Sequence, residues 1–219
     1  MKKAVLAALF LSLVAAMASL PASADTLFTT LGPGGSYDSS GAWNVSGTAY
    51  GGIVIGNPFT LGSGATVSDA VLALGNLFGS NPPMNVYIES DNIGTPDSIL
   101  ASLTQVGTIP SSIGGGGLVN FTCSGVACDL AAGNYWLVAV EPDSTTAQDW
   151  YFAYNDPTTN RAAGLGGSPT GLTVDSDLTE NAFQIDGSPD AATPEPSSFL
   201  LLGSGLLGLA GLLKRKLTA

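Results

Sequence analysis

The sequence predicts an all-β fold: one antiparallel β-sandwich or jelly-roll-like domain, flanked by a short apolar segment at each end. Short apolar or alternating runs recur along the chain, and clusters of Gly, Pro, Asn and Ser separate them. The long middle of the chain has almost no Lys, Arg or Gln, so the residues that stabilise exposed helix positions are missing. One run, Tyr135–Val140, is apolar at every position, which is typical of a central strand buried on both faces.

Nine strands are expected from these runs: Gly51–Ile55, Thr66–Leu74, Met84–Ser90, Ala101–Gly107, Leu118–Thr122, Tyr135–Val140, Asp149–Tyr154, Gly171–Val174 and Ala182–Asp186. Turn residues stand between them at Gly56-Asn57-Pro58, Gly79–Pro83, Asn92–Pro96 and Gly114–Gly117. Residues 97–100 allow one helical turn at most.

The N-terminus predicts a cleaved secretion signal over residues 1–24. Lys2 and Lys3 precede an apolar run from Ala4 to Leu20, and the small residues Ala22-Ser23-Ala24 follow it, as signal peptidase requires. The apolar run is shorter than the roughly 20 residues of a membrane span, which disfavours the alternative of an uncleaved anchor.

The C-terminus carries a second signal over residues 194–219. Pro194-Glu195-Pro196 precedes the apolar run Phe199–Leu213, and the basic cluster Lys214-Arg215-Lys216 follows it. We expect a short apolar helix in the membrane, with the basic cluster on the cytoplasmic side and the domain on the other side.

This ordered set of Pro-Glu-Pro, apolar helix and basic cluster resembles the PEP-CTERM sorting signal of exported proteins of Gram-negative bacteria. The resemblance implies recognition by an exosortase, processing near Pro194-Glu195-Pro196, and association with exopolysaccharide and biofilm. It places the mature protein beyond the inner membrane, in the cell envelope, at the cell surface or in the extracellular matrix. A simple C-terminal anchor is the alternative.

The mature domain, residues 25–193, is long enough for one core and strongly acidic. It contains sixteen acidic residues and a single base, Arg161, so its net charge is about −15. Nucleic-acid binding is excluded, because it requires Lys and Arg to neutralise phosphates.

Three runs of the domain, Val71–Gly75, Val86–Pro96 and Tyr135–Ala139, resemble a choice-anchor domain of type R. That resemblance implies a surface-anchored β-sandwich whose function is largely undefined. Such domains often have Gly after the proline of the turn, where this chain has Asp97.

Cys123 and Cys128 are the only cysteines, and in an oxidising compartment a pair this close is expected to form a disulfide. Free reactive thiols are the alternative.

The residue inventory argues against catalysis. The chain has no His and the mature domain has no Lys, which removes the usual general base, the Ser-His and Cys-His arrangements and the common zinc sites. A pair of carboxylates could still hydrolyse a glycosidic bond. We expect the three glutamates of the domain, Glu89, Glu141 and Glu180, to be solvated surface acids, and no enzymatic activity.

Two candidate binding sites remain. Asp175, Asp177 and Glu180 offer carboxylate oxygens to a structural calcium ion, although polar turns explain them equally well, and no other cofactor is expected. Trp150, Tyr151 and Tyr154 could form a platform for a carbohydrate, with core packing as the alternative. Other aromatic residues considered for such a platform are Trp43, Tyr50 and Trp136.

The sequence thus favours a non-catalytic structural or adhesive protein of the surface or matrix. A carbohydrate-binding module is the alternative, and a carboxylate-dependent glycosidase is a more distant one. The partners expected are signal peptidase, an exosortase-type enzyme, the membrane through the C-terminal helix, and exopolysaccharide.

Overall fold

The computed structural model describes residues 24–155 and 157–190. The chain divides into two compact units, residues 1–189 and 190–219. Residues 1–23 of the predicted secretion signal and all of the predicted tail, 194–219, lie outside the described residues. No helix in the described part is long and apolar enough to cross a membrane.

The described residues form strands and three single-turn 3₁₀ helices, η1 (Pro33–Gly35), η2 (Thr48–Tyr50) and η3 (Val126–Cys128). The strands are β1 (Asp25–Thr29), β2 (Asp38–Ser46), β3 (Val54–Leu61), β4 (Ala65–Phe78), β5 (Asn85–Asp91), β6 (Pro96–Val106), β7 (Gly117–Thr122), β8 (Asp129–Leu130), β9 (Gly133–Val140), β10 (Ala147–Phe152), β11 (Thr158–Gly164), β12 (Thr173–Thr179) and β13 (Phe183–Pro189).

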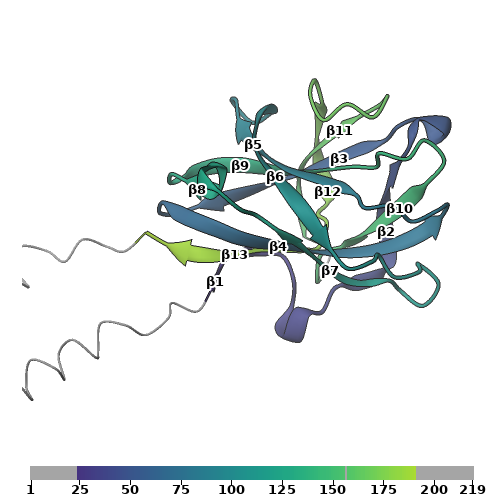
Figure 1. Cartoon of the computed structure of the whole chain (residues 1–219), viewed down its shortest axis with the longest axis horizontal. Coiled ribbons are helices and arrows are strands. Elements are labelled where there is room, and N and C mark those ends of the chain that lie inside the picture. The colour runs from purple at the N-terminus through teal and green to yellow at the C-terminus, as the bar shows by residue number, and fades with distance from the viewer. Residues whose placement is uncertain (1–23, 156, 191–219) are drawn as a thin grey trace, which may run out of the picture. The chain divides into compact units, whose positions relative to one another are not determined.

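The strands lie in two facing layers, and all strand pairs are antiparallel (Figure 1). One layer contains β1, β13, β4 and β7, with β10 and β8 beside β4 and β2 beside β10, and the other contains β5, β9, β3, β11 and β12. β6 joins the layers, because its first part pairs with β5 and its last three residues pair with β7. The predicted all-β antiparallel sandwich is confirmed.

The main hydrophobic core fills the space between the two layers. Alternate residues of β4, β7 and β13 face alternate residues of β3, β5 and β9 across this space, as the period of a strand requires. The largest fully buried side chains of this core are Trp150, Phe121, Phe183, Ile55, Leu72, Leu74, Met84, Ile88, Ile109, Leu137 and Ile185.

β9 confirms the prediction of a strand that is buried on both faces. It lies between β5 and β3, and its residues 135–140 are all buried. Tyr135, Leu137 and Ala139 point into the main core. Trp136, Val138 and Val140 point to the opposite face, where Leu172, just before β12, packs on them.

Two expectations about local structure are wrong. Residues 97–100, expected to allow a helical turn, belong to strand β6. Gly56-Asn57-Pro58, expected to form a turn, lies inside β3. The proline is tolerated there because β11 pairs with β3 only at residues 54–56, so this side of β3 is open at Pro58 and a missing N–H leaves no ladder bond unmade.

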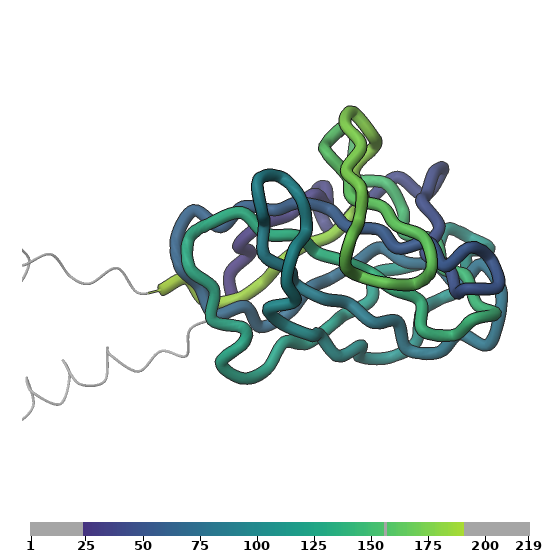
Figure 2. The backbone as a smooth tube through the Cα atoms, turned by 90° about the horizontal axis from the view of Figure 1, so that it is seen from above, coloured from purple at the N-terminus to yellow at the C-terminus, as the bar shows by residue number. Residues whose placement is uncertain are grey.

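Four strands were not expected: β1, β2, β8 and β11. β8 has two residues, β1 and β2 each pair with a single strand, and β11 carries a polar run with one Arg. Such strands lack the apolar alternation of a half-buried strand. β11 and β12 form a hairpin that projects from the sandwich (Figure 2). The expected turns at Gly79–Pro83, Asn92–Thr95 and Gly114–Gly116 are confirmed between their strands.

The core closes within the described residues. Every member of the three hydrophobic clusters lies between Leu27 and Ile185, and the first and last strands pair with each other. We therefore expect a fragment of residues 24–190 to fold independently.

Candidate functional site

The glutamates of the domain are buried, so the expectation of solvated surface acids is wrong. Glu89 on β5 has no exposed surface, Glu141 after β9 is 3% exposed, and Glu180 after β12 is partly buried. Burial raises the pKa of Glu89 to about 7, with the charge of Asp97 adding to the effect, and burial alone raises the pKa of Glu180 to about 7. Burial also raises the pKa of Glu141. The backbone N–H of Asp143 donates to its carboxylate at 2.9 Å and partly lowers that pKa again. Sequence could not show this burial, because the covering residues come from distant strands.

The carboxylates that raise the pKa values of Glu89 and Glu141 belong to aspartates. The carboxylate that raises the pKa of Glu89 is Asp97, and the one that raises the pKa of Glu141 is Asp143. None of the three glutamates lines either of the two pockets described below. The geometry therefore gives no support to two glutamates that face each other across a cleft.

The predicted aromatic platform is not present on β10. Trp150 is fully buried, and its indole N–H donates to the carbonyl of Ala182 at 3.0 Å. Tyr151 is 4% exposed and packs on Tyr37, with 5.6 Å between ring centroids. Only Tyr154, which is 43% exposed, lies at the surface. Core packing, the alternative for these residues, therefore holds for Trp150 and Tyr151, and of the three rings only Tyr154 is exposed enough to contact a carbohydrate.

The acidic residues of β12 do not assemble into a metal centre. Asp175 and Asp177 are exposed, and Glu180 lies beyond the end of the strand. Across residues 24–155 and 157–190 there is no group of three His, Cys, Asp or Glu residues that could hold a metal ion. The calcium prediction thus gains no support from the geometry.

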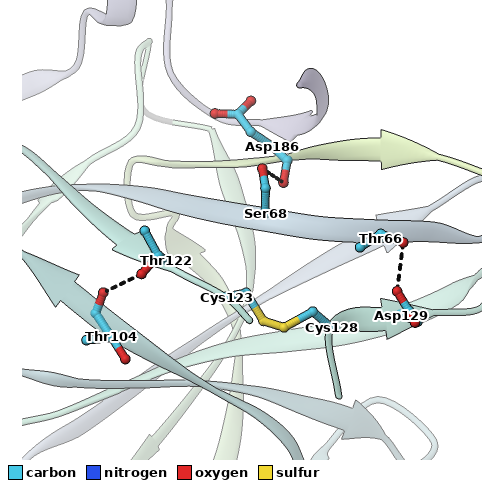
Figure 3. The surroundings of a disulfide bond; sticks show 8 residues. All are labelled: Thr66, Ser68, Thr104, Thr122, Cys123, Cys128, Asp129 and Asp186. Atoms are coloured by element: carbon cyan, nitrogen blue, oxygen red, sulfur yellow. Dashed lines mark hydrogen bonds between the residues drawn. A yellow bond between two sulfur atoms is a disulfide. The ribbon is translucent and has the colours of Figure 1, made fainter. Parts of the chain in front are cut away.

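The predicted disulfide is present. Cys123 and Cys128 are bonded, with an S–S distance of 2.01 Å, and they connect the end of β7 to η3 (Figure 3). Hydrogen bonds between neighbouring strands surround the bond: the hydroxyl of Thr66 donates to Asp129 at 2.7 Å, and that of Ser68 donates to the carbonyl of Asp186 at 3.3 Å. The bond therefore fixes the chain where β7 and β8 both lie beside β4.

Replacing both cysteines by serine is expected to destabilise the domain by about 2 kcal/mol, because the closed loop is small and removes little entropy from the unfolded chain. The measurement is urea unfolding of both proteins in the absence of reductant. Adding reductant should destabilise the wild type to the same level and leave the variant unchanged. A change in the free energy of unfolding near zero would contradict the prediction that the disulfide constrains the unfolded chain.

A pocket that the sequence did not predict lies where β2, β3, β11 and β12 meet. Its volume is about 520 Å³, and its lining includes Trp43, Ile53, Ile55, Arg161, Ala163 and Thr173. We call it the Arg161 pocket. Its walls are mainly apolar, and Arg161 supplies its only charged group.

Arg161 is unusually buried for a cation. It projects from β11, is 6% exposed, and its guanidinium carbon lies 3.7 Å from the ring centroid of Trp43. Its Nε and Nη1 atoms are buried and have no hydrogen-bond partner among the described residues. Burial lowers the pKa of Arg161, and the charge of Asp175, its neighbour on β12, opposes that effect.

The platform under the guanidinium is itself held in place. The indole N–H of Trp43 donates to the carbonyl of Thr179 at 3.1 Å, and the ring of Phe152 packs at 5.7 Å on Trp43. The one signal of this site in the sequence was that Arg161 is the single base of the mature domain. Nothing in the sequence indicated that it lies against Trp43.

A second, more polar hollow of about 420 Å³ is also lined by β2 and shares Asn44 with the Arg161 pocket. Ser39, Ser40, Asn44, Ser112 and Asp149 contribute to its lining. Asp149 accepts from Asn44 at 2.6 Å and from Ser112 at 2.6 Å, so its carboxylate is already held by two donors.

Comparison with known families concerns the tail alone. Residues 192–216 match the family model of the PEP-CTERM protein-sorting motif. The chain therefore carries the signal of an exported protein that an exosortase-type enzyme sorts to the cell envelope. No curated protein and no solved structure matches the chain. The likeness of the domain to choice-anchor type R stays a prediction.

Proposed function

We propose that this protein is a non-catalytic structural or adhesive component of the cell surface or the extracellular matrix, associated with exopolysaccharide. The observation that carries the proposal is the sorting motif at residues 192–216, directly after a domain that ends at Pro189. A protein with this motif is delivered to the cell envelope, so in this proposal its role lies there. Signal peptidase and an exosortase-type enzyme are its processing partners in this proposal.

The properties of the domain support a role outside the cytoplasm. An internal disulfide suits an oxidising compartment. A net charge of about −15 on the mature domain keeps a secreted protein soluble and monomeric. The lack of His in the chain favours a passive or binding role over hydrolysis.

Carbohydrate binding is a second candidate function. The polar hollow beside β2 favours it, because hydroxyl, amide and carboxylate groups are the partners that sugar hydroxyls require. Trp150 and Tyr151 do not favour it, since both are buried. A glycosidase has no comparable support.

Replacing Pro194-Glu195-Pro196 by three alanines is expected to abolish processing, because the motif is the feature that the sorting enzyme recognises. An unprocessed form should then accumulate in the membrane fraction of the producing cell. The measurement is immunoblotting of membrane, surface and medium fractions with an antibody against the domain.

The control variant replaces Leu217 and Thr218, which follow the matched residues 192–216, by alanine and should be processed normally. Normal processing and release of the triple-alanine variant would contradict the sorting proposal. A host strain without its exosortase should reproduce the phenotype of the triple-alanine variant.

A further inference from the structure

The Arg161 pocket contains a buried cation whose charged neighbour, Asp175 on β12, is exposed. Arg161 is more than nine-tenths buried and lines the pocket, yet Nε and Nη1 have no acceptor within the described residues. A buried N–H group without an acceptor is costly, and a buried charge without one more so. Nε and Nη1 have no exposed surface, so a ligand would act on the charge instead: a negative group beside the exposed part of the guanidinium would offset the buried positive charge, and the pocket therefore favours an anion.

The position of the guanidinium limits how an anion can approach it. One face of its plane lies on Trp43, and Trp43 is fixed by its bond to Thr179, so the plane cannot turn freely. Nε and Nη1 have no exposed surface, so Nη2 is the guanidinium nitrogen that remains for a ligand in the pocket. A carboxylate can accept from it in a charge-assisted hydrogen bond.

The other lining residues favour a ligand whose uncharged part is apolar. Ile53, Ile55 and Ala163 present apolar surface, and Asn44 and Thr173 are the uncharged polar side chains of the lining. A sugar acid would need partners for several hydroxyl groups, which two side chains cannot supply. A volume of about 520 Å³ suits a small organic molecule.

The charge of the domain limits the size of the anion. With sixteen acidic residues against one base, a polyanion would be repelled by the surface around the pocket. A molecule with a single negative charge meets little of that repulsion once its carboxylate is next to Arg161.

We propose that the Arg161 pocket binds a small monocarboxylate with an apolar body, the carboxylate on the guanidinium of Arg161 and the body against Ile53, Ile55 and Ala163. This inference is independent of the sorting proposal, since it concerns the domain and not the tail. It adds a ligand-binding function to a protein whose proposed role is structural.

The test uses residues 24–190, with phenylacetate as the probe, in calorimetric and NMR titrations at pH 7. Two comparison ligands test the contributions of the carboxylate and of the apolar ring to the affinity. 2-Phenylethanol has the same ring without the charge, and glucuronate has the carboxylate on a polar body. We expect saturable binding of phenylacetate and at least about tenfold weaker binding of both others, the margin of one charge-assisted hydrogen bond.

Arg161→Met is the first variant, because methionine keeps an unbranched side chain and removes the charge. We expect an affinity for phenylacetate that is lower by about tenfold or more, with a melting temperature that is unchanged or higher. A purely structural Arg161, worth only its stacking on Trp43, would instead lower the melting temperature and leave no phenylacetate binding to lose.

Asp175→Asn and Asp177→Asn form a matched pair on β12 that does not depend on Arg161→Met folding. Each removes one negative charge from an exposed position, but Asp175 is the neighbour of Arg161. We expect Asp175→Asn to bind phenylacetate about two- to fivefold more tightly than Asp177→Asn. Equal affinities of these two variants for phenylacetate would overturn the proposal. So would binding of 2-phenylethanol as tight as that of phenylacetate, or tighter binding of glucuronate. The lack of saturable phenylacetate binding would overturn it as well.

Discussion

The domain is expected to lose stability as the pH rises from about 4.5 to about 7, the reverse of what ordinary surface carboxylates produce. Burial raises the pKa of Glu89 and of Glu180 from 4.5 to about 7. Between these values the folded protein keeps both protons and the unfolded chain releases them. The free energy of unfolding is then highest below pH 4.5 and falls as the pH passes through the raised pKa values.

The expected size of this effect is large. One pKa unit corresponds to about 1.4 kcal/mol, so Glu89 can contribute up to about 3 kcal/mol. Glu89 is fully buried and neither of its carboxylate oxygens has a hydrogen-bond partner in the described residues, so little solvent screens it. Glu180 should contribute less, because it is only partly buried.

Urea unfolding at pH 4.5, 6 and 8 measures the effect, with Glu89→Gln as the decisive variant. Glutamine resembles the protonated acid, so the variant should match the wild type near pH 4.5 and exceed its stability at pH 8. Asp190→Asn, at an exposed position, removes the same charge and should leave the slope unchanged. A wild type that is as stable at pH 8 as at pH 4.5 would contradict the burial of the neutral acid.

Asn181→Ala is expected to destabilise the domain by about 3–5 kcal/mol, which is exceptional for a single polar residue. Asn181 precedes β13 and is fully buried. Its amide group donates to the carbonyl of Trp150 at 2.6 Å and accepts from the Nδ2 of Asn57 at 3.1 Å. Asn57, on β3, is also fully buried and accepts from the backbone N–H of Asn181 at 3.2 Å. The substitution would leave the buried Nδ2 of Asn57 without its acceptor and would remove a side-chain donor from the Trp150 carbonyl.

Thermal unfolding measures the loss, which for a domain of this size corresponds to a melting temperature lower by roughly 10 °C. Asn134→Ala is the matched control: Asn134 accepts from Thr60 at 2.8 Å, but the pair is exposed, so the cost should stay below about 1 kcal/mol. The double variant of Asn57 and Asn181 to alanine should cost less than the sum of its single variants. Additive costs would show that the two amides do not act as a unit.

The same pair of amides explains where the sequence prediction of the fold failed. Gly56-Asn57-Pro58 has the composition of a turn, and only a partner from the other layer makes a buried Asn tolerable inside a strand. That partner, Asn181, is far along the chain, so no local pattern reports it. By contrast, β9 was predicted from its own residues, since burial on both faces leaves an uninterrupted apolar run.

The candidate site was harder to predict than the fold for a similar reason. The disulfide was predictable, because Cys123 and Cys128 are close in sequence and have no competing partner. The Arg161 pocket was not, because Arg161 and Trp43 come from opposite ends of the domain and meet only when β11 pairs with β3. For Trp150 the sequence left a carbohydrate platform and core packing both open, because alternation shows which residues share a face and not which face is covered.

The pairing of the first strand with the last has a consequence for export. Among the described strands, β1 pairs with β13 alone, and β13 separates it from β4. During translocation β1 emerges first and has no neighbour until residues 183–189 follow at the end. The sorting motif begins at residue 192, only three residues after the end of β13, so the strand that completes the sheet is exported just before the motif. A chain delayed at that point would present the bare edges of β1 and β4 to neighbouring copies, and the timing of secretion would then decide between folding and aggregation.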